Sequence, residues 1–115
     1  MTLSTHVLDA TTGRPAAGVR VLLERWSADA WAPVGSGLTG PDGRLDGRGG
    51  GWLPAGEPAR GVYRITFSSG SYFADRGTAS FYPEITVAFE VSSPGEHYHV
   101  PLLLSPFAYS TYRGS

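Results

Sequence analysis

The chain has 115 residues, a formal net charge of −1 and no cysteine, so disulfides, a thiol nucleophile and thiolate metal ligands are excluded. Its nine basic residues are scattered arginines, which excludes the basic stripe of a nucleic-acid-binding protein. No apolar run reaches the roughly 20 residues of a membrane span, and the first residues lack the pattern of a signal peptide. We therefore expect a single soluble domain over residues 1–115, located in the cytoplasm, with no membrane or nucleic-acid partner.

Short β-prone runs alternate with glycine and proline, of which the chain has 16 and 9. This spacing is typical of a sandwich or barrel. Within the runs, apolar and polar residues alternate with the period of a strand that is buried on one face. The expected strands cover residues 3–10, 19–26, 31–39 (broken by Pro33), 61–67 and 84–91. Their predicted apolar faces are Val19, Val21 and Leu23, then Tyr63, Ile65 and Phe67, then Ile85, Val87, Phe89 and Val91.

Between these strands the sequence predicts one turn, one loop and one helix. Gly40-Pro41-Asp42-Gly43 has the composition of a turn, because proline presets φ and glycine supplies a positive φ. Residues 47–58 are rich in glycine and are interpreted as a loop, with a short strand near Trp52 as the alternative. A single short helix is expected over residues 71–79, between a capping serine and a glycine near the end.

The segment from His97 to Leu104 places two histidines on one face of a strand. Side chains at i and i+2 point the same way, so His97 and His99 lie opposite the apolar residues at alternating positions from 98 to 104. Pro101 cannot donate to a ladder, which indicates an edge or a bulge nearby. Histidine suits proton transfer near neutral pH. The same pair also fits a zinc site or a solvent-exposed surface, and the pattern does not choose among these.

Three further features are candidates for a site. His6 lies on the first predicted strand, where a lone histidine is more often structural than catalytic. Arg44 follows the turn, either as an exposed residue or as a cation that holds an anionic or carbonyl-rich substrate. The last residues, from Tyr109 to Ser115, carry hydroxyls and an arginine up to the chain end. No GxSxG elbow, P-loop or dinucleotide-binding glycine motif is present, so an enzyme with this sequence would use water activated by histidine.

Together these segments resemble the transthyretin-related 5-hydroxyisourate hydrolases of the transthyretin-like family. The resemblance covers essentially the whole chain. Its most specific parts are the Tyr-Arg-Gly-Ser ending and the His-Tyr-His strand, because transthyretin itself lacks both. The matching segments are Leu3–Asp9, Asp42–Arg44, Phe81–Glu84, His97–Pro106 and Tyr109–Ser115.

The resemblance implies an all-β, transthyretin-like sandwich of two four-stranded sheets with one short helix. It implies a homotetramer, a dimer of dimers, with the sites in a channel between paired dimers. The implied reaction is hydrolytic ring opening of 5-hydroxyisourate to 2-oxo-4-hydroxy-4-carboxy-5-ureidoimidazoline in urate catabolism, without cofactor or metal. His97 is implied only as a supporting neighbour. Carried over onto this sequence, the catalytic residues are His6, Arg44, His99 and Ser115, and the substrate-binding residues are His6, Arg44 and Tyr112.

Three other functions stay open on the residues alone. The first is a transthyretin-type carrier that binds a small aromatic ligand in the same channel. Such a carrier would favour apolar and amphipathic lining groups, whereas histidines and an arginine suit proton chemistry. The second is a zinc-dependent amidohydrolase that uses His97 and His99, which a chelator would inactivate. The third is a purely structural β module, against which the combination of histidines, arginine and polar tail argues.

Overall fold

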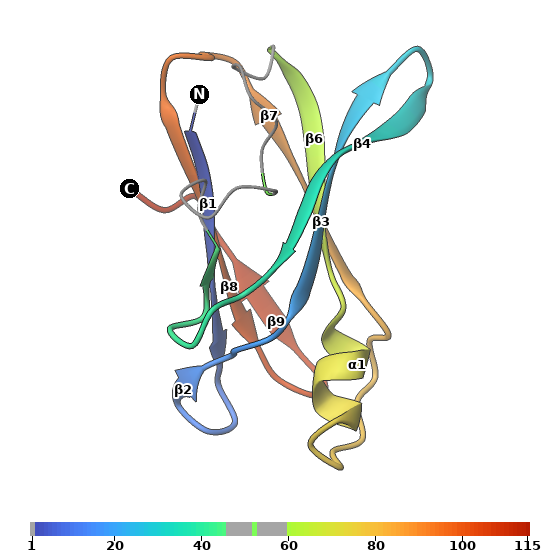
Figure 1. Ribbon diagram of the computed structural model, residues 1–115, viewed down its shortest axis with the longest axis vertical. Coiled ribbons are helices and arrows are strands. Elements are labelled where there is room, and N and C mark those ends of the chain that lie inside the picture. The colour runs from blue at the N-terminus through green and yellow to red at the C-terminus, as the bar shows by residue number, and fades with distance from the viewer. Residues whose placement is uncertain (1, 46–51, 53–59) are drawn as a thin grey trace.

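The computed structural model describes residues 2–45, 52 and 60–115, and it folds them into two β-sheets with one short helix (Figure 1). These two sheets with one short helix confirm the predicted all-β sandwich. No helix in these ranges has the length and apolarity to cross a membrane. The first sheet contains β1 (Thr2–Asp9), β2 (Arg14–Pro15), β5 (Arg44–Leu45), β8 (His97–Leu104) and β9 (Tyr109–Thr111). The second contains β3 (Arg20–Ser27), β4 (Ala30–Leu38), β6 (Gly61–Phe67) and β7 (Ile85–Val91), and α1 spans Ser69–Ala74.

The first sheet has five strands where four were expected, in the order β2-β1-β8-β9 with β5 also paired to β1. β8 runs along β1 from Thr2 to Asp9. Because that edge of β1 is occupied over its whole length, β2 and β5 both pair with the opposite edge, at different heights. The two short strands therefore share one strand position, and the extra strand does not change the layers.

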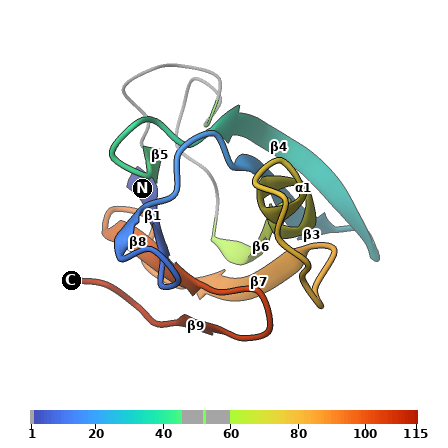
Figure 2. The same cartoon turned by 90° about the horizontal axis from the view of Figure 1, so that it is seen from below.

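The predicted strand faces form the core between the two sheets, which face each other in the end-on view of Figure 2. The alternation of apolar and polar residues gives each strand one apolar face. Burying that face removes apolar surface from water and so drives the packing of the two sheets. Val87 and Phe89 are only partly buried but pack against the same core. The remaining residues of the predicted faces are all buried: Val19, Val21, Leu23, Tyr63, Ile65, Phe67, Ile85 and Val91.

The predicted loop over residues 47–58 lies outside the described residues except for Trp52. Trp52 is fully buried, and its indole Nε1–H donates to the carbonyl oxygen of Leu3 at 3.1 Å. Trp52 itself occupies a bend, and the residues around it, on which a short strand was the alternative, lie outside the described ranges. The buried indole nitrogen has the partner that such a group requires.

The predicted helix over residues 71–79 is shorter and begins earlier, at Ser69. Its start is fixed by a tertiary contact, because the N–H of Gly70 donates to the carbonyl of Pro83 at 3.0 Å. A side chain at Gly70 would overlap this backbone. The helix ends before Gly77, which has φ of +67° and donates its N–H to the carbonyl of the last helical residue at 3.0 Å. This left-handed conformation after the helix end favours glycine. The periodicity of apolar residues in the sequence does not place a helix end to within one residue.

β8 is an interior strand, so of the two alternatives expected from Pro101, an edge or a bulge nearby, the edge is wrong. Its pairing with the C-terminal segment is interrupted at this residue instead. β9 ends with Thr111 opposite Leu102, and the pairing resumes as a single bridge between His99 and Gly114. Proline has no N–H to donate at the gap, and its carbonyl accepts the hydroxyl of Thr111 at 2.7 Å.

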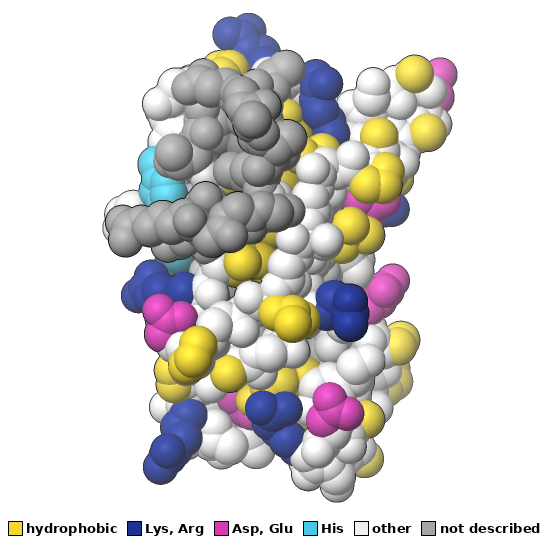
Figure 3. Space-filling model, viewed as in Figure 1, with side chains coloured by type: hydrophobic (Ala, Val, Ile, Leu, Met, Phe, Trp, Pro, Cys, Tyr) yellow, Lys and Arg dark blue, Asp and Glu magenta, His cyan; other side chains and the backbone are white. Residues whose placement is uncertain are grey.

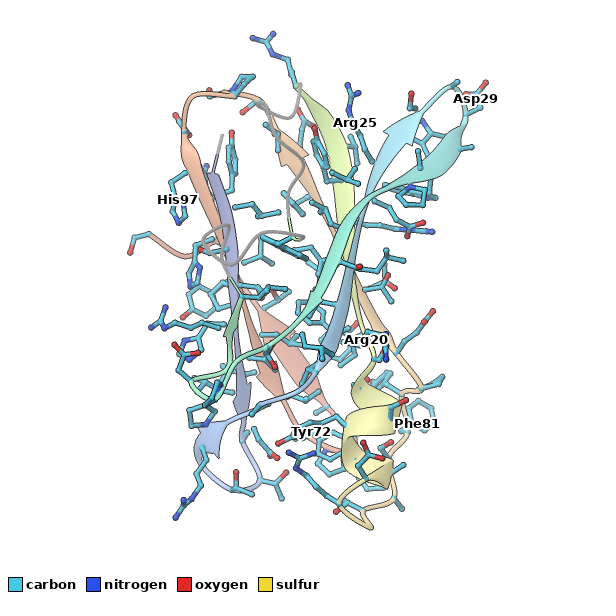
Figure 4. All side chains as sticks on the ribbon, viewed as in Figure 1. Arg20, Arg25, Asp29, Tyr72, Phe81 and His97 are labelled. Atoms are coloured by element: carbon cyan, nitrogen blue, oxygen red, sulfur yellow. The ribbon has the colours of Figure 1, made fainter. Side chains whose placement is uncertain are left out.

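A buried hydrogen bond joins α1 to the first sheet. The hydroxyl of Tyr72, which is labelled in Figure 4, donates to Oδ2 of Asp9 at 2.9 Å. Asp9 is only 2% exposed. Tyr72→Phe leaves a buried carboxyl oxygen without this donor, so we expect the free energy of unfolding to fall by about 1–3 kcal/mol. Urea denaturation measures it, with Tyr109→Phe, at an exposed tyrosine, as the matched control. Equal values for the Tyr72 variant and the wild type would contradict the expectation.

Candidate functional site

The outer face of the first sheet gathers His6, Arg44 and His99. His6 lies on β1 directly opposite Arg44 on β5, and β8 runs along the other edge of β1 with His99 opposite Ser4. Opposed side chains share a face of the sheet. Their neighbours along the strands are buried or, in the case of Leu45, partly buried against the core, so these side chains point away from the second sheet. Figure 3 shows histidine side chains at the left edge of the molecule, with basic and acidic groups below them.

The turn predicted at Gly40–Gly43 holds both His6 and Arg44. Gly43 has φ of +77° and donates its N–H to the carbonyl of Gly40 at 2.8 Å, which confirms the turn. Within it, Oδ1 of Asp42 accepts the N–H of Arg44 at 3.0 Å. The carbonyl oxygen of Asp42 lies 3.0 Å from Nε2 of His6. A carbonyl only accepts, so Nε2 of His6 carries a proton, and Nδ1 of the neutral ring is free to accept one.

Ser4 lies between two histidines. Its Oγ is 2.7 Å from Nδ1 of His99 and 3.2 Å from Nε2 of His97. The two rings are nearly parallel, at 14°, with their centroids 6.4 Å apart, and Figure 4 shows His97 pointing outward from β8. Ser4 was not among the predicted site residues. The signal was its position two residues before His6, which places both side chains on the same strand face.

The C-terminal residues reach this cluster through Gly114. The N–H of Gly114 donates to the carbonyl of His99 at 2.8 Å. Any side chain at Gly114 would overlap the His99 ring, so only glycine fits at this position. Ser115 follows directly, whereas Tyr112 is 60% exposed. Within the described part of the chain, no hydrogen bond joins the side chain of either residue to the ring of His6 or of His99.

The surroundings of His99 favour its uncharged ring. Burial lowers the pKa of His99 below its ordinary value of 6.5, and the nearby charges of Arg44, His97 and His6 lower it further. At neutral pH this imidazole is therefore a neutral base or hydrogen-bond donor. Over residues 2–45, 52 and 60–115, no group of three His, Cys, Asp or Glu side chains converges as metal ligands.

A hollow of about 290 Å³ opens between β7 and the C-terminal segment, on the side where β7 and β9 lie in Figure 2. Its walls include Val87, Phe89, Val100 and Tyr112, and it meets the polar cluster only at His99. His6 and Arg44 do not line it. The groups capable of proton transfer thus lie on an open face, and the hollow beside them is mainly apolar.

Comparison with known proteins gives consistent matches over the whole chain. The model of the HIUase/Transthyretin family matches residues 3–114. A Salmonella typhimurium protein named 5-hydroxyisourate hydrolase is 48% identical over 113 residues, which are 98% of this chain and 80% of that protein. The solved 5-hydroxyisourate hydrolase of Klebsiella pneumoniae has a TM-score of 0.84 and 35% identity, and the match covers 100% of both chains. Sea bream transthyretin in complex with thyroxine has a TM-score of 0.88 and 31% identity, over 97% of this chain and 93% of that one.

Proposed function

Because this chain belongs to the HIUase/Transthyretin family, we propose that it catalyses the hydrolysis of 5-hydroxyisourate on the outer face of its first sheet. The observation that carries the proposal is the meeting of two imidazoles, His6 and His99, with the guanidinium of Arg44. Two titratable rings beside a fixed cation suit proton transfer together with stabilisation of a developing negative charge. The reaction belongs to urate catabolism, which we place in the cytoplasm.

The proposed reaction opens a ring amide with one molecule of water. A neutral imidazole of His6 or His99 removes a proton from water as its oxygen bonds to the ring carbonyl carbon. Arg44 donates hydrogen bonds to the oxyanion that forms. When the C–N bond breaks, the proton passes to the leaving ring nitrogen, giving 2-oxo-4-hydroxy-4-carboxy-5-ureidoimidazoline. Ser115 and Tyr112 orient the substrate by hydrogen bonds.

We propose that the site is completed in a homotetramer, a dimer of dimers. An open face does not exclude water, and water exclusion strengthens the electrostatic interactions of a site. A second copy over this face would turn it into a channel. Among the described strands, β7 and β9 each form an edge of a sheet on the same side of the chain, and strands of another copy could add there.

The experiment generates 5-hydroxyisourate from urate with urate oxidase and follows its ultraviolet decay with and without the protein. We expect faster decay that survives a chelator, which also separates this proposal from a zinc-dependent amidohydrolase. Decay no faster than the spontaneous background would contradict the proposal. A ligand-binding assay on the same sample would then test the carrier, an alternative that the likeness to transthyretin and the mainly apolar hollow favour.

The titration of His99 gives a prediction about Arg44. A guanidinium disfavours the charged imidazole, so Arg44→Met is expected to raise the pKa of His99 toward 6.5. In the wild type the ring stays neutral to a lower pH than free histidine, and folding stability falls as pH drops from 6.5 through the lowered pKa. NMR titration of the histidine ring protons measures the shift, with the exposed Arg14→Met on β2 as the control. A pKa of His99 that stays the same or falls in Arg44→Met would refute the prediction.

A further inference from the structure

The Ser4 hydroxyl is a polar group of this face that the mechanism above does not use. Ser4 is half-buried on β1, directly opposite His99. Its Oγ contacts Nδ1 of His99 at 2.7 Å and Nε2 of His97 at 3.2 Å. A hydroxyl can accept and donate at once, so a single side chain reaches both imidazoles.

The His99 ring is held on two sides. Ser4 contacts its Nδ1, and the backbone of Gly114 packs against the Cδ2 edge so closely that no Cβ fits. A 180° flip of the ring would put Cδ2 in the place of Nδ1 and lose the hydrogen bond with Ser4. Nε2 is therefore the ring nitrogen that Ser4 leaves for other partners.

We propose that Ser4 is a positioning residue: it occupies Nδ1 of His99, so that Nε2 exchanges the proton with water or substrate, and it couples this ring to His97. The inference rests on the proposed function. A hydroxyl has one hydrogen, so it donates to one ring nitrogen and accepts from the other. Of the two nitrogens that face Ser4, one therefore carries a proton and the other does not when both rings are neutral.

Charged and titratable groups around His99 come from each neighbouring element. They are His6 on β1, Arg44 on β5 and His97 on β8. Of these groups, Arg44 carries a fixed positive charge and helps to lower the pKa of His99, which keeps the His99 ring neutral.

The kinetic test compares Ser4→Ala with Ser4→Thr, which keeps the hydroxyl. Ser110→Ala, on the exposed β9 of the same sheet, is the matched control. We expect alanine to lower kcat by about 10- to 100-fold, as small misplacements of a reacting group do, with KM nearly unchanged. Threonine should restore most of kcat. The acid limb of the pH profile of kcat should be the same in Ser4→Thr as in the wild type, whereas Ser4→Ala should shift that limb.

The second measurement is the nitrogen-15 NMR of the histidine rings in wild type and Ser4→Ala, without substrate. We expect one protonated and one bare nitrogen facing Ser4 in the wild type, and a mixture of tautomers for His99 in the alanine variant. Mixed tautomers already in the wild type would overturn the inference, and so would a folded alanine variant with unchanged kcat and ring shifts. These spectra need no turnover, so a protein that fails to hydrolyse 5-hydroxyisourate would still show whether Ser4 orients His99.

Discussion

Replacing His99 by alanine is expected to lower kcat about 10²- to 10⁴-fold, the range that positioned proton transfer contributes. The ring sits beside Arg44 and is neutral at pH 7, so the proposed mechanism loses a group that exchanges protons with water or the leaving nitrogen. The side chain is only partly buried on the outer face, so the core is not disturbed. Steady-state decay of 5-hydroxyisourate measures the loss, and circular dichroism checks that the fold is intact.

Leu103→Ala is the matched control for this variant. Leu103 lies on β8, four residues from His99 on the same outer face, and is partly exposed. It removes side-chain volume from this face without removing a titratable group, so turnover should stay close to that of the wild type. Full turnover in His99→Ala, or an equal loss in Leu103→Ala, would exclude His99 from the reaction.

Removing residues 112–115 is expected to lower kcat/KM by about 10²-fold or more. The deletion takes away Tyr112 and Ser115, which the proposal assigns to substrate orientation, and the Gly114 backbone that packs against the His99 ring. Misplacing reacting groups by about 1 Å has effects of this size. β9 ends at Thr111, so the sheet keeps its strands and the same ultraviolet assay can be run on folded protein.

Arg113→Ala is the control for the deletion. It breaks the ion pair with Glu96, whose N–O distance is 3.0 Å, while Gly114 and Ser115 stay in the chain. Both partners of this pair are more than half exposed, and such pairs contribute little to stability. We expect near-normal turnover in Arg113→Ala. A truncated protein that is as active as the wild type would show that the tail is not part of the site.

The strands could be predicted from the sequence because their signal is local. Alternation over a few residues identifies the buried face of β3, β6 and β7, and each of these faces was predicted correctly. The helix start could not be predicted, because it depends on a contact between Gly70 and Pro83 that lie far apart in the chain. Capping and periodicity describe only the chain near the helix end.

The candidate site also has a part that local sequence predicts and a part that it does not. The two histidines of β8 could be placed on one face from their spacing alone. Their meeting with His6 required the parallel pairing of β1 with β8, which joins the two ends of the chain and leaves no mark in local sequence. The family resemblance supplied that link for His6 and Arg44. It did not supply Ser4, whose contacts follow from the register of these two strands.

The most direct test of the proposed site is a double-mutant cycle on His6 and His99, with kcat/KM for 5-hydroxyisourate measured in His6→Ala, His99→Ala and the double variant. Residues that act on one reacting centre give losses that are far from additive. We therefore expect the double variant to lose about as much activity as the more damaged single variant. Losses that multiply, or a double variant that keeps wild-type activity, would contradict a single site shared by these two histidines.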